Sequence, residues 1–397
     1  MTSAAALPAW ARETPAVDVL RALAKAGSEG RLVGGCVRDG LLGRAFKDVD
    51  IATPLPPDAV QRALRAAGLG AIPTGIAHGT VTALVRHQPI EVTTLRQDVE
   101  TDGRHARVVF TEDWGLDAQR RDLTMNALFL DAHGELYDYV GGLEDLKAGR
   151  VRFIGDPRRR IEEDYLRLLR FLRFHAHYAT GPLDPEGLAA AVDLAPRLAG
   201  ISGERKAQEL LRLLAAPDPL PVLQVMADSG IFRWLLPGLP LPDLSVVAGL
   251  GDPDPLLRLA ALLPPDPEAA RSAAQALRLS KRQAGVLADL AKKRDLSTQG
   301  ARRRLLYRKG PALLADLAQL AQARGELAAT EARAARAEAE AWQPRDFPIG
   351  GKDLAALGLP AGPEIGQLLA SLEDWWIEQD FAPDRGALLA EAQRRLG

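Results

Sequence analysis

The sequence of 397 residues lacks the features of an exported or membrane-embedded protein. It contains one cysteine, Cys36, which excludes an intramolecular disulfide and favours a reducing compartment. The N-terminus has no basic start followed by an apolar core, and no run of about eighteen apolar residues could span a membrane. We therefore expect a cytoplasmic protein with no membrane partner.

The sequence also has little net charge. Its 50 Lys and Arg residues nearly balance its 52 Asp and Glu residues, which gives a formal net charge of −2. Because global basicity is absent, any nucleic-acid site must be a local basic patch. The length exceeds what one compact core usually holds, so two or more domains are expected.

Two familiar kinds of site are missing as well. The last of the six histidines is His177, so a His-Asp metal domain with phosphohydrolase activity cannot lie in the C-terminal half. The lysine-bearing phosphate loop G-x-x-x-x-G-K-[ST] does not occur, which disfavours ordinary ATPase chemistry.

The pattern of apolar residues changes along the chain. Up to about Tyr139, short β-branched runs alternate with helical patterns and glycine-containing turns. From Arg159 onward nearly every segment has helical spacing, and proline clusters separate the helical blocks. The sequence therefore predicts an α/β head followed by a long all-α remainder, which is an α+β fold.

One short stretch combines a glycine turn with two carboxylates. "VGGCVRDGLL" is typical of a strand, a tight turn and a helix, and "KDVDIAT" places Asp48 and Asp50 on one face of a short strand. Backbone N–H groups at Gly34 and Gly35 can approach an anion, Arg38 can bind the same phosphate, and two carboxylates with phosphate oxygens suit Mg²⁺. The alternative is a solvated strand end beside an ordinary turn.

A second stretch, "RIEEDYLRLLRFLRF", predicts one amphipathic helix over residues 160–174. At 100° per residue the apolar side chains form a stripe on one side. The opposite side then carries one acid and three arginines, namely Asp164, Arg167, Arg170 and Arg173. The alternative is a helix whose Arg–Asp pairs are simply solvated.

The glycine turn followed by Asp48 and Asp50 resembles the first signature of the class II tRNA nucleotidyltransferases (CCA-adding enzymes) and the related bacterial poly(A) polymerases, and "RIEEDYLRLLRFLRF" matches a later motif. Further matching motifs follow in order over residues 31–214, including "GIAHGTVTALV", "IEVTTLR", "RRDLTMNALFLD" and "ISGERKAQELLRLL". The residue sequences of the motifs "DVETDGRHA" and "EDYLRLLRFLRF" are more similar to those of the alphaproteobacterial and eukaryotic branch than to those of the Bacillus-like branch.

The resemblance implies a fold and a set of domains. The head would be a polymerase-β-like mixed sheet, followed by an all-α neck, body and tail. The expected domains are a catalytic head over residues 1–139, a neck with the base-selecting helix over 140–215, a body over 216–300 and a tRNA-binding tail over 301–397.

The resemblance also implies an activity, namely template-independent addition of the 3′-terminal CCA to tRNA from CTP and ATP, with release of pyrophosphate. Asp48 and Asp50 would be catalytic and would bind Mg²⁺ for two-metal nucleotidyl transfer. The nucleotide would be bound by Gly35, Arg38, Arg121, Asp164, Arg167, Arg170 and Arg173.

Asp164 and Arg167 would select the base. The carboxylate accepts from the exocyclic amino group that cytosine and adenine share, and the guanidinium donates to the ring nitrogen beside it. Asp122 would help to read the ribose. Glu91 is a candidate third carboxylate, for metal or for the attacking hydroxyl; a buried structural Glu paired with Arg96 would give the same sequence pattern.

Three alternatives remain open at this point. Residues 96–108 are polar and contain glycine, which predicts a mobile loop, and in this family a retained loop favours CCA or A addition over CC addition alone. The alternatives are partial (A-adding or CC-adding) activity, poly(A) polymerase activity, and a catalytically inactive RNA-binding relative.

Basic clusters occur in the helical part of the sequence, for example at residues 292–294 and 301–310. They predict salt-sensitive binding to the phosphates of the tRNA acceptor arm.

Overall fold

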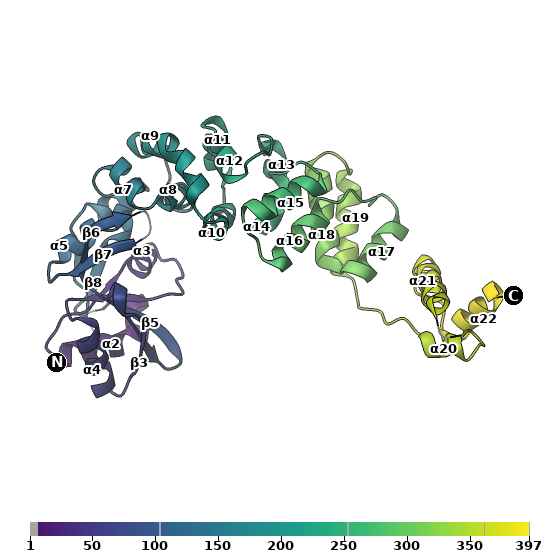
Figure 1. The fold of residues 1–397 in the computed structure, drawn as a ribbon, viewed down its shortest axis with the longest axis horizontal. Helices are drawn as coiled ribbons and strands as arrows, with labels where there is room; N and C mark the ends of the chain where they lie inside the picture. The colour runs from purple at the N-terminus through teal and green to yellow at the C-terminus, as the bar shows by residue number, and fades with distance from the viewer. Residues whose placement is uncertain (1–6, 103–104, 252–253, 361, 397) are drawn as a thin grey trace. The chain divides into compact units, whose positions relative to one another are not determined.

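The computed structural model describes residues 7–102, 105–251, 254–360 and 362–396. The chain divides into two compact units, Met1–Leu235 and Leu236–Gly397, called unit 1 and unit 2 below. Unit 1 contains the sheet and unit 2 is helical (Figure 1). The expected α+β fold with a mixed-sheet head is confirmed, while the finer division at residues 139, 215 and 300 stays a prediction.

A seven-stranded mixed sheet forms the head of unit 1. Its strand order is β3-β4-β5-β2-β1-β8-β9; β2 and β5 are parallel and the other neighbours are antiparallel. Its strands are β1 Arg31–Val33, β2 Asp50–Thr53, β3 Gly70–Gly75, β4 Thr80–Val85, β5 Gln88–Thr94, β8 Leu128–Asp131 and β9 Leu136–Asp138.

One face of this sheet is covered by helices. Alternate side chains of β4 and β5, such as Val81, Ala83 and Val92, are fully buried, and helices α2 and α4 pack against these strands (Figure 1). The period-two burial explains why these apolar residues alternate with polar ones in the sequence. The helices of the head are α1 Ala9–Arg12, α2 Ala16–Lys25, α3 Gly35–Leu41, α4 Pro57–Ala66, α5 Trp114–Gln119 and α6 Gly142–Lys147.

The segment expected to be a mobile loop over residues 96–108 is a β-hairpin instead. Strands β6 Arg96–Asp102 and β7 His105–Phe110 pair antiparallel, and residues 103–104 lie outside the described residues. Composition gave the wrong local structure because alternating charged residues also suit an exposed two-stranded ribbon, whose backbone groups pair with each other.

The expected continuous helix over residues 160–174 is also wrong. Helix α7 ends at Glu163, Asp164 is extended with φ −157° and ψ 107°, and α8 begins at Leu166. The Asp164 carboxylate accepts a hydrogen bond from the Leu166 N–H two residues further on, a local side-chain-to-backbone bond that competes with a continuous helix. The remaining helices of unit 1 are α7 Pro157–Glu163, α8 Leu166–Tyr178, α9 Pro185–Leu194, α10 Gly203–Leu214, α11 Leu220–Asp228 and α12 Phe232–Leu235.

Unit 2 consists of helices, and its C-terminal part has its own apolar core around Leu354, Leu372 and Trp376. Within the described ranges, no helix is both long and apolar enough to cross a bilayer. The helices are α13 Leu244–Ala248, α14 Pro255–Ala261, α15 Pro267–Ala276, α16 Lys281–Leu290, α17 Gln299–Lys309, α18 Pro311–Ala323, α19 Ala329–Glu340, α20 Gly351–Ala355, α21 Pro363–Glu378 and α22 Arg385–Leu396.

Candidate functional site

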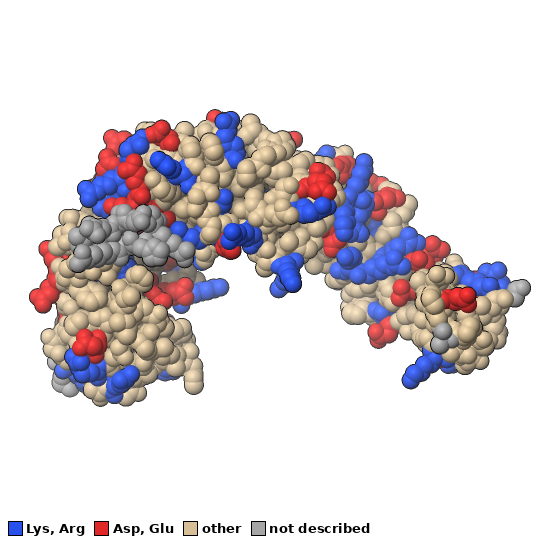
Figure 2. Space-filling view, viewed as in Figure 1, with Lys and Arg blue, Asp and Glu red and all other residues tan. Residues whose placement is uncertain are grey.

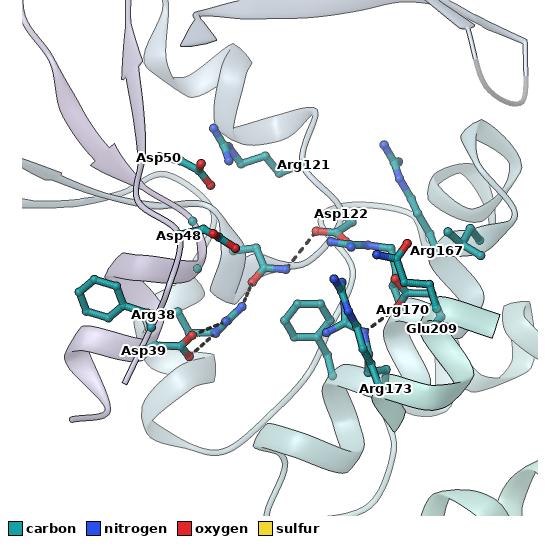
Figure 3. Close-up of a pocket in the computed structure, with 18 of the residues that line it drawn as sticks. Arg38, Asp39, Asp48, Asp50, Arg121, Asp122, Arg167, Arg170, Arg173 and Glu209 are labelled. Carbon is teal, nitrogen blue, oxygen red and sulfur yellow. Dashed lines mark hydrogen bonds and ion pairs between the residues drawn. The ribbon is translucent and has the colours of Figure 1, made fainter. Parts of the chain in front are cut away.

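A cavity of about 840 Å³ in unit 1 brings the two sequence stretches together (Figure 3). The glycine turn and the aspartate pair line one part of it, and the start of α8 lines another. All nine predicted site residues line this one cavity: Gly35, Arg38, Asp48, Asp50, Arg121, Asp164, Arg167, Arg170 and Arg173. The geometry therefore places the carboxylates and the acid–arginine set around one space large enough for a nucleotide.

The glycine turn joins β1 to α3. Gly34 has φ 78°, a left-handed conformation that side chains other than glycine rarely adopt, and a Cβ there would meet the Nη1 of Arg121 at 3.7 Å. Gly35 is the first residue of α3, so its N–H belongs to the helix start, where backbone donors have no partner inside the helix. The turn therefore presents backbone to the cavity without a side chain in the way.

Arg38 lies almost fully buried at the floor of this end of the cavity, with 7% of its surface exposed. It donates to both carboxylate oxygens of Asp39, at 2.9 and 2.8 Å, and to the side-chain oxygen of Asn126 at 2.6 Å. Its guanidinium also lies 4.3 Å from the ring centroid of Tyr178. Because these contacts fix the guanidinium, it can offer a rigid positive charge to an anion in the cavity.

The two aspartates occupy different local structures. Asp50 begins β2, whereas Asp48 precedes the strand, so the expected placement of both on one strand face is wrong. Both nevertheless line the cavity (Figure 3). Glu91 faces Asp50 from the parallel strand β5 and is exposed, so the alternative of a buried structural glutamate is also wrong.

The carboxylates of Asp48, Asp50 and Glu91 repel one another electrostatically. Burial raises the pKa of Asp50 from 3.8 to about 6, with Glu91 and Asp48 adding to the effect and Arg121 opposing it. A divalent cation would relieve this repulsion. Among the described residues no group of three or more His, Cys, Asp and Glu side chains is arranged around a metal position. A pair of hard oxygen ligands still fits a cation that takes its other ligands from phosphate and water.

Arg121 and Asp122 follow α5 and face different partners. The guanidinium of Arg121 donates to Asp117 at 2.9 Å, and Arg121 points toward Asp50 and the glycine turn (Figure 3). Asp122 accepts from Arg170 at 2.6 Å. Burial alone would raise the pKa of Asp122, but the Arg170 guanidinium holds it far below its usual range. Asp122 is therefore ionised and positions Arg170; its expected role at the ribose stays a prediction.

The two residues expected to read the base are held by protein partners. The Asp164 carboxylate accepts from Arg205 of α10 at 2.7 Å, and Arg167 donates to Glu163 and to the backbone oxygen of Arg160. Both side chains line the cavity and are partly exposed to it. Their hydrogen-bonding groups therefore lie at the cavity wall in a fixed arrangement.

Helix α10 contributes wall residues that the sequence analysis missed. Glu209 accepts from Arg173 at 2.6 Å, and Arg205, Gln208 and Arg212 also line the cavity. Arg205 and Glu209 are four residues apart, and this spacing inside "ISGERKAQELLRLL" is a helical-face signal that could have found them.

A basic cleft lies in unit 2, apart from this site. The two basic clusters noted in the sequence converge there around a space of about 540 Å³ lined by Lys292, Arg294, Arg304, Arg308 and Lys309. Figure 2 shows Lys and Arg gathered over the region of α17. The charge is shared with acidic partners, since Lys292, Arg294 and Lys309 all bind Asp289.

Comparison with known families assigns the head to a class. Residues 30–152 match the Poly A polymerase head domain, and this match includes every strand of the seven-stranded sheet. Residues 182–241 match a family described as a probable RNA and SrmB-binding site of polymerase A, and residues 257–392 match tRNA nucleotidyltransferase domain 2.

Relatives that match nearly the full length of the chain define its enzyme family more narrowly. The mitochondrial CCA tRNA nucleotidyltransferase 1 of Danio rerio is 36% identical over 379 residues, covering 91% of this chain and 86% of that protein. The human protein of the same name is 35% identical over 92% of this chain and 87% of its own length. The chain therefore belongs to the CCA tRNA nucleotidyltransferase family, an enzyme family that implies dependence on a divalent metal.

Bacterial relatives give a consistent result. The Streptococcus gordonii CCA-adding enzyme is 40% identical over 58% of this chain and 55% of that protein. The structure of the Bacillus stearothermophilus CCA-adding enzyme in complex with CTP matches with a TM-score of 0.80 at 26% identity, covering 96% of each chain. The near full-length match to the vertebrate proteins is in line with the expected similarity to the alphaproteobacterial and eukaryotic branch.

Proposed function

We propose that the protein adds the 3′-terminal CCA to tRNA without a nucleic-acid template, using CTP and ATP and releasing pyrophosphate. The observation that carries this proposal is the single cavity shared by the aspartate pair and by Asp164 and Arg167. The names of the relatives support the tRNA end as acceptor, and the Bacillus stearothermophilus enzyme, solved with CTP, supports the nucleotide.

The triphosphate would lie against the glycine turn. Backbone N–H groups near Gly35 and the buried guanidinium of Arg38 would bind its terminal phosphates, and Arg121 would lie near the aspartates. Arg170, held by Asp122, and Arg173, held by Glu209, add positive charge further along the wall. Because each arginine is fixed by an acid, the site can orient the nucleotide with little reorganisation.

Asp48 and Asp50 would hold Mg²⁺. When bound, this ion lowers the pKa of the attacking 3′-hydroxyl and stabilises charge on the α-phosphate in a two-metal nucleotidyl transfer. Glu91, which pairs in register with Asp50, would be a candidate to accept a proton from that hydroxyl or to act as a further ligand. Burial first and then the neighbouring carboxylates raise the pKa of Asp50, and a bound cation would offset both effects.

Asp164 and Arg167 would select the base. Cytosine and adenine present an amino donor beside a ring-nitrogen acceptor, and both complement a carboxylate and a guanidinium. Uracil and guanine place a carbonyl where the amino group is needed, so an acceptor would face the carboxylate at a cost of about 1–3 kcal/mol. The partners Arg205 and Glu163 would keep both groups oriented at the wall.

The testing experiment supplies purified protein with tRNA transcripts that end before CCA, after C, and after CC. Each receives one NTP at a time, and the products are sized at nucleotide resolution. Sequential use of CTP and ATP on the first transcript is the expected result. Extension limited to C or to A would indicate partial addition, and a long A tail would indicate a poly(A) polymerase. The absence of any extended product would contradict the proposed enzymatic activity.

A further inference from the structure

The face of the head sheet that α2 and α4 leave uncovered carries a continuous row of side chains. Register places Asp50 of β2 opposite Glu91 of β5, Glu91 opposite Thr82 of β4, and Thr82 opposite Ile72 of β3. Directly paired residues project to the same side of a sheet, and neighbouring strands lie about 4.8 Å apart. The row therefore leads from the cavity to the sheet edge in about 14 Å.

Beyond Glu91 and the buried Thr82, the outer part of this face carries exposed apolar side chains. Ile72 is 48% exposed and Leu84 is 39% exposed, and Pro89, which pairs with Leu84, is exposed as well. We call Ile72, Leu84 and Pro89 the outer patch. The residues of the same strands that point the other way, such as Val81 and Ala83, are fully buried. On β4 and β5 the exposed apolar side chains therefore lie on one face, whereas the edge strand β3 is exposed or partly exposed along its length.

The strands that carry the outer patch are held firmly. The hydroxyls of Thr74 and Thr82 hydrogen-bond at 2.7 Å across the irregular pairing of β3 with β4. The hydroxyls of Thr80 and Thr93 hydrogen-bond at 3.1 Å across β4 and β5. These polar side chains satisfy one another, so this sheet face is already ordered and a bound molecule would not have to rearrange it.

The position of the outer patch relative to the aspartates points to its occupant. In the proposed function, the NTP fills the cavity on the side of Asp50 that carries Arg38, Arg121 and the start of α8. The attacking hydroxyl must approach the α-phosphate from the side opposite the leaving pyrophosphate. On the sheet, the neighbour of Asp50 away from β1 is Glu91, followed by the outer patch.

Resting on that function, we propose that the outer patch supports the 3′-terminal nucleotide of the RNA being extended. Base faces are apolar and pack against side chains with little sequence preference, and open sheet faces of other domains bind single-stranded RNA in this way. The terminal base of the acceptor changes after each addition. A contact without hydrogen-bond readout therefore suits this position, in contrast to the polar wall that reads the incoming NTP.

The experiment replaces the apolar surface while keeping strand-compatible residues. The double variant Ile72→Thr/Leu84→Thr is compared with Val192→Thr, a matched control on α9 where the valine is 36% exposed. We expect kcat/KM for a tRNA transcript lacking CCA to fall about tenfold in the double variant, since base stacking is worth about 1–3 kcal/mol. The Kd for CTP measured without RNA should stay within about twofold of wild type.

A second measurement tests contact with the base itself. An acceptor whose 3′-terminal nucleotide is abasic should be a poorer substrate for the wild-type protein by a similar factor, and the double variant should not distinguish it from the intact acceptor. Equal sensitivity of both proteins to the abasic end, or an unchanged kcat/KM in the double variant, would overturn the proposal. So would a shift of sedimentation from dimer to monomer with unchanged RNA kinetics, because the patch would then bind a second copy of the chain.

These outcomes separate the two proposals. If the wild-type protein adds no nucleotide to any transcript, the proposed function fails. If wild type extends the transcripts and the double variant extends them equally well, only the role of the outer patch fails.

Discussion

The carboxylate of Asp164, which lies between α7 and α8, accepts a hydrogen bond from Arg205 of α10 at 2.7 Å, although the two residues lie 41 positions apart. Arg167 is bound in the same manner by Glu163. Both base-selecting candidates are therefore oriented by protein partners before a nucleotide arrives. A cytosine or adenine edge needs to compete only for their remaining hydrogen-bonding capacity.

Base selection should weaken when this carboxylate is removed. In Asp164→Ala, the ratio of kcat/KM for CTP to that for UTP should fall by about 10- to 100-fold, because uracil no longer meets an unpaired acceptor. Glu162→Ala, on the exposed side of α7, serves as the control and should keep the wild-type ratio. Single-nucleotide incorporation with each NTP in turn measures the ratio. An unchanged ratio in Asp164→Ala would remove Asp164 from base selection.

Chemistry should depend on the aspartate pair while RNA binding should not. Asp48→Ala should lower kcat by at least about 10³-fold, because stabilisation of the transferring phosphate is lost, and leave the Kd for tRNA within about twofold. Asp58→Ala, at an exposed position on α4, is the matched control. Retained addition by Asp48→Ala in the presence of Mg²⁺ would rule out this catalytic site.

The stability of the metal-free protein should report the raised pKa of Asp50. Because the pKa in the folded state is about 6 and the ordinary value is 3.8, this group stabilises the fold fully below about pH 3.8, and its contribution is lost as the pH rises through about 6. Asp50→Asn should therefore raise the Tm at pH 8 more than at pH 4. The corresponding gain in the free energy of unfolding at pH 8 should be at most about 3 kcal/mol.

Thermal unfolding at the two pH values checks this expectation, with Asp58→Asn as the exposed control. Addition of Mg²⁺ at pH 8 should raise the Tm of wild type and should have little effect on Asp50→Asn. A Tm for Asp50→Asn equal to or below that of wild type at pH 8 would show that the Asp50 carboxylate is not destabilised by its surroundings.

RNA binding should be strongly sensitive to salt. The logarithm of the tRNA association constant should fall linearly with the logarithm of salt concentration, because contacts with phosphates release counterions. Replacing Arg308 in the basic cleft by Ala should reduce the magnitude of that slope by about 0.9, while Arg62→Ala, exposed on α4, should not. A tRNA affinity that does not change between low and moderate salt would contradict binding through phosphate contacts.

Much of the catalytic head could be predicted from local sequence. The strands β2, β4, β5 and β8 follow from alternating β-branched runs, and Gly34 follows from the need for a turn with positive φ. The same reasoning placed Asp48 on a strand that begins only at Asp50. Strand ends depend on pairing partners that the sequence does not specify, and here β2 pairs only from Asp50 onward.

The wall of the site was harder to predict because its partners come from distant elements. The break at Asp164 is accompanied by a local hydrogen bond from the Leu166 N–H to the Asp164 carboxylate, and a helical wheel does not reveal such a break. The partners of Arg170 and Arg173 are Asp122 and Glu209, 48 and 36 residues away. Family resemblance supplied the cavity-lining arginines, but only the folded chain shows which acid fixes each one.

The most direct measurement is the structure of the protein with CTP bound. The cytosine edge should lie within hydrogen-bonding distance of Asp164 and Arg167, with the triphosphate along Gly35 and Arg38 and its α-phosphate beside Asp48 and Asp50. A CTP molecule that reaches only one of these two groups, or that binds outside this cavity, would contradict the single-site arrangement.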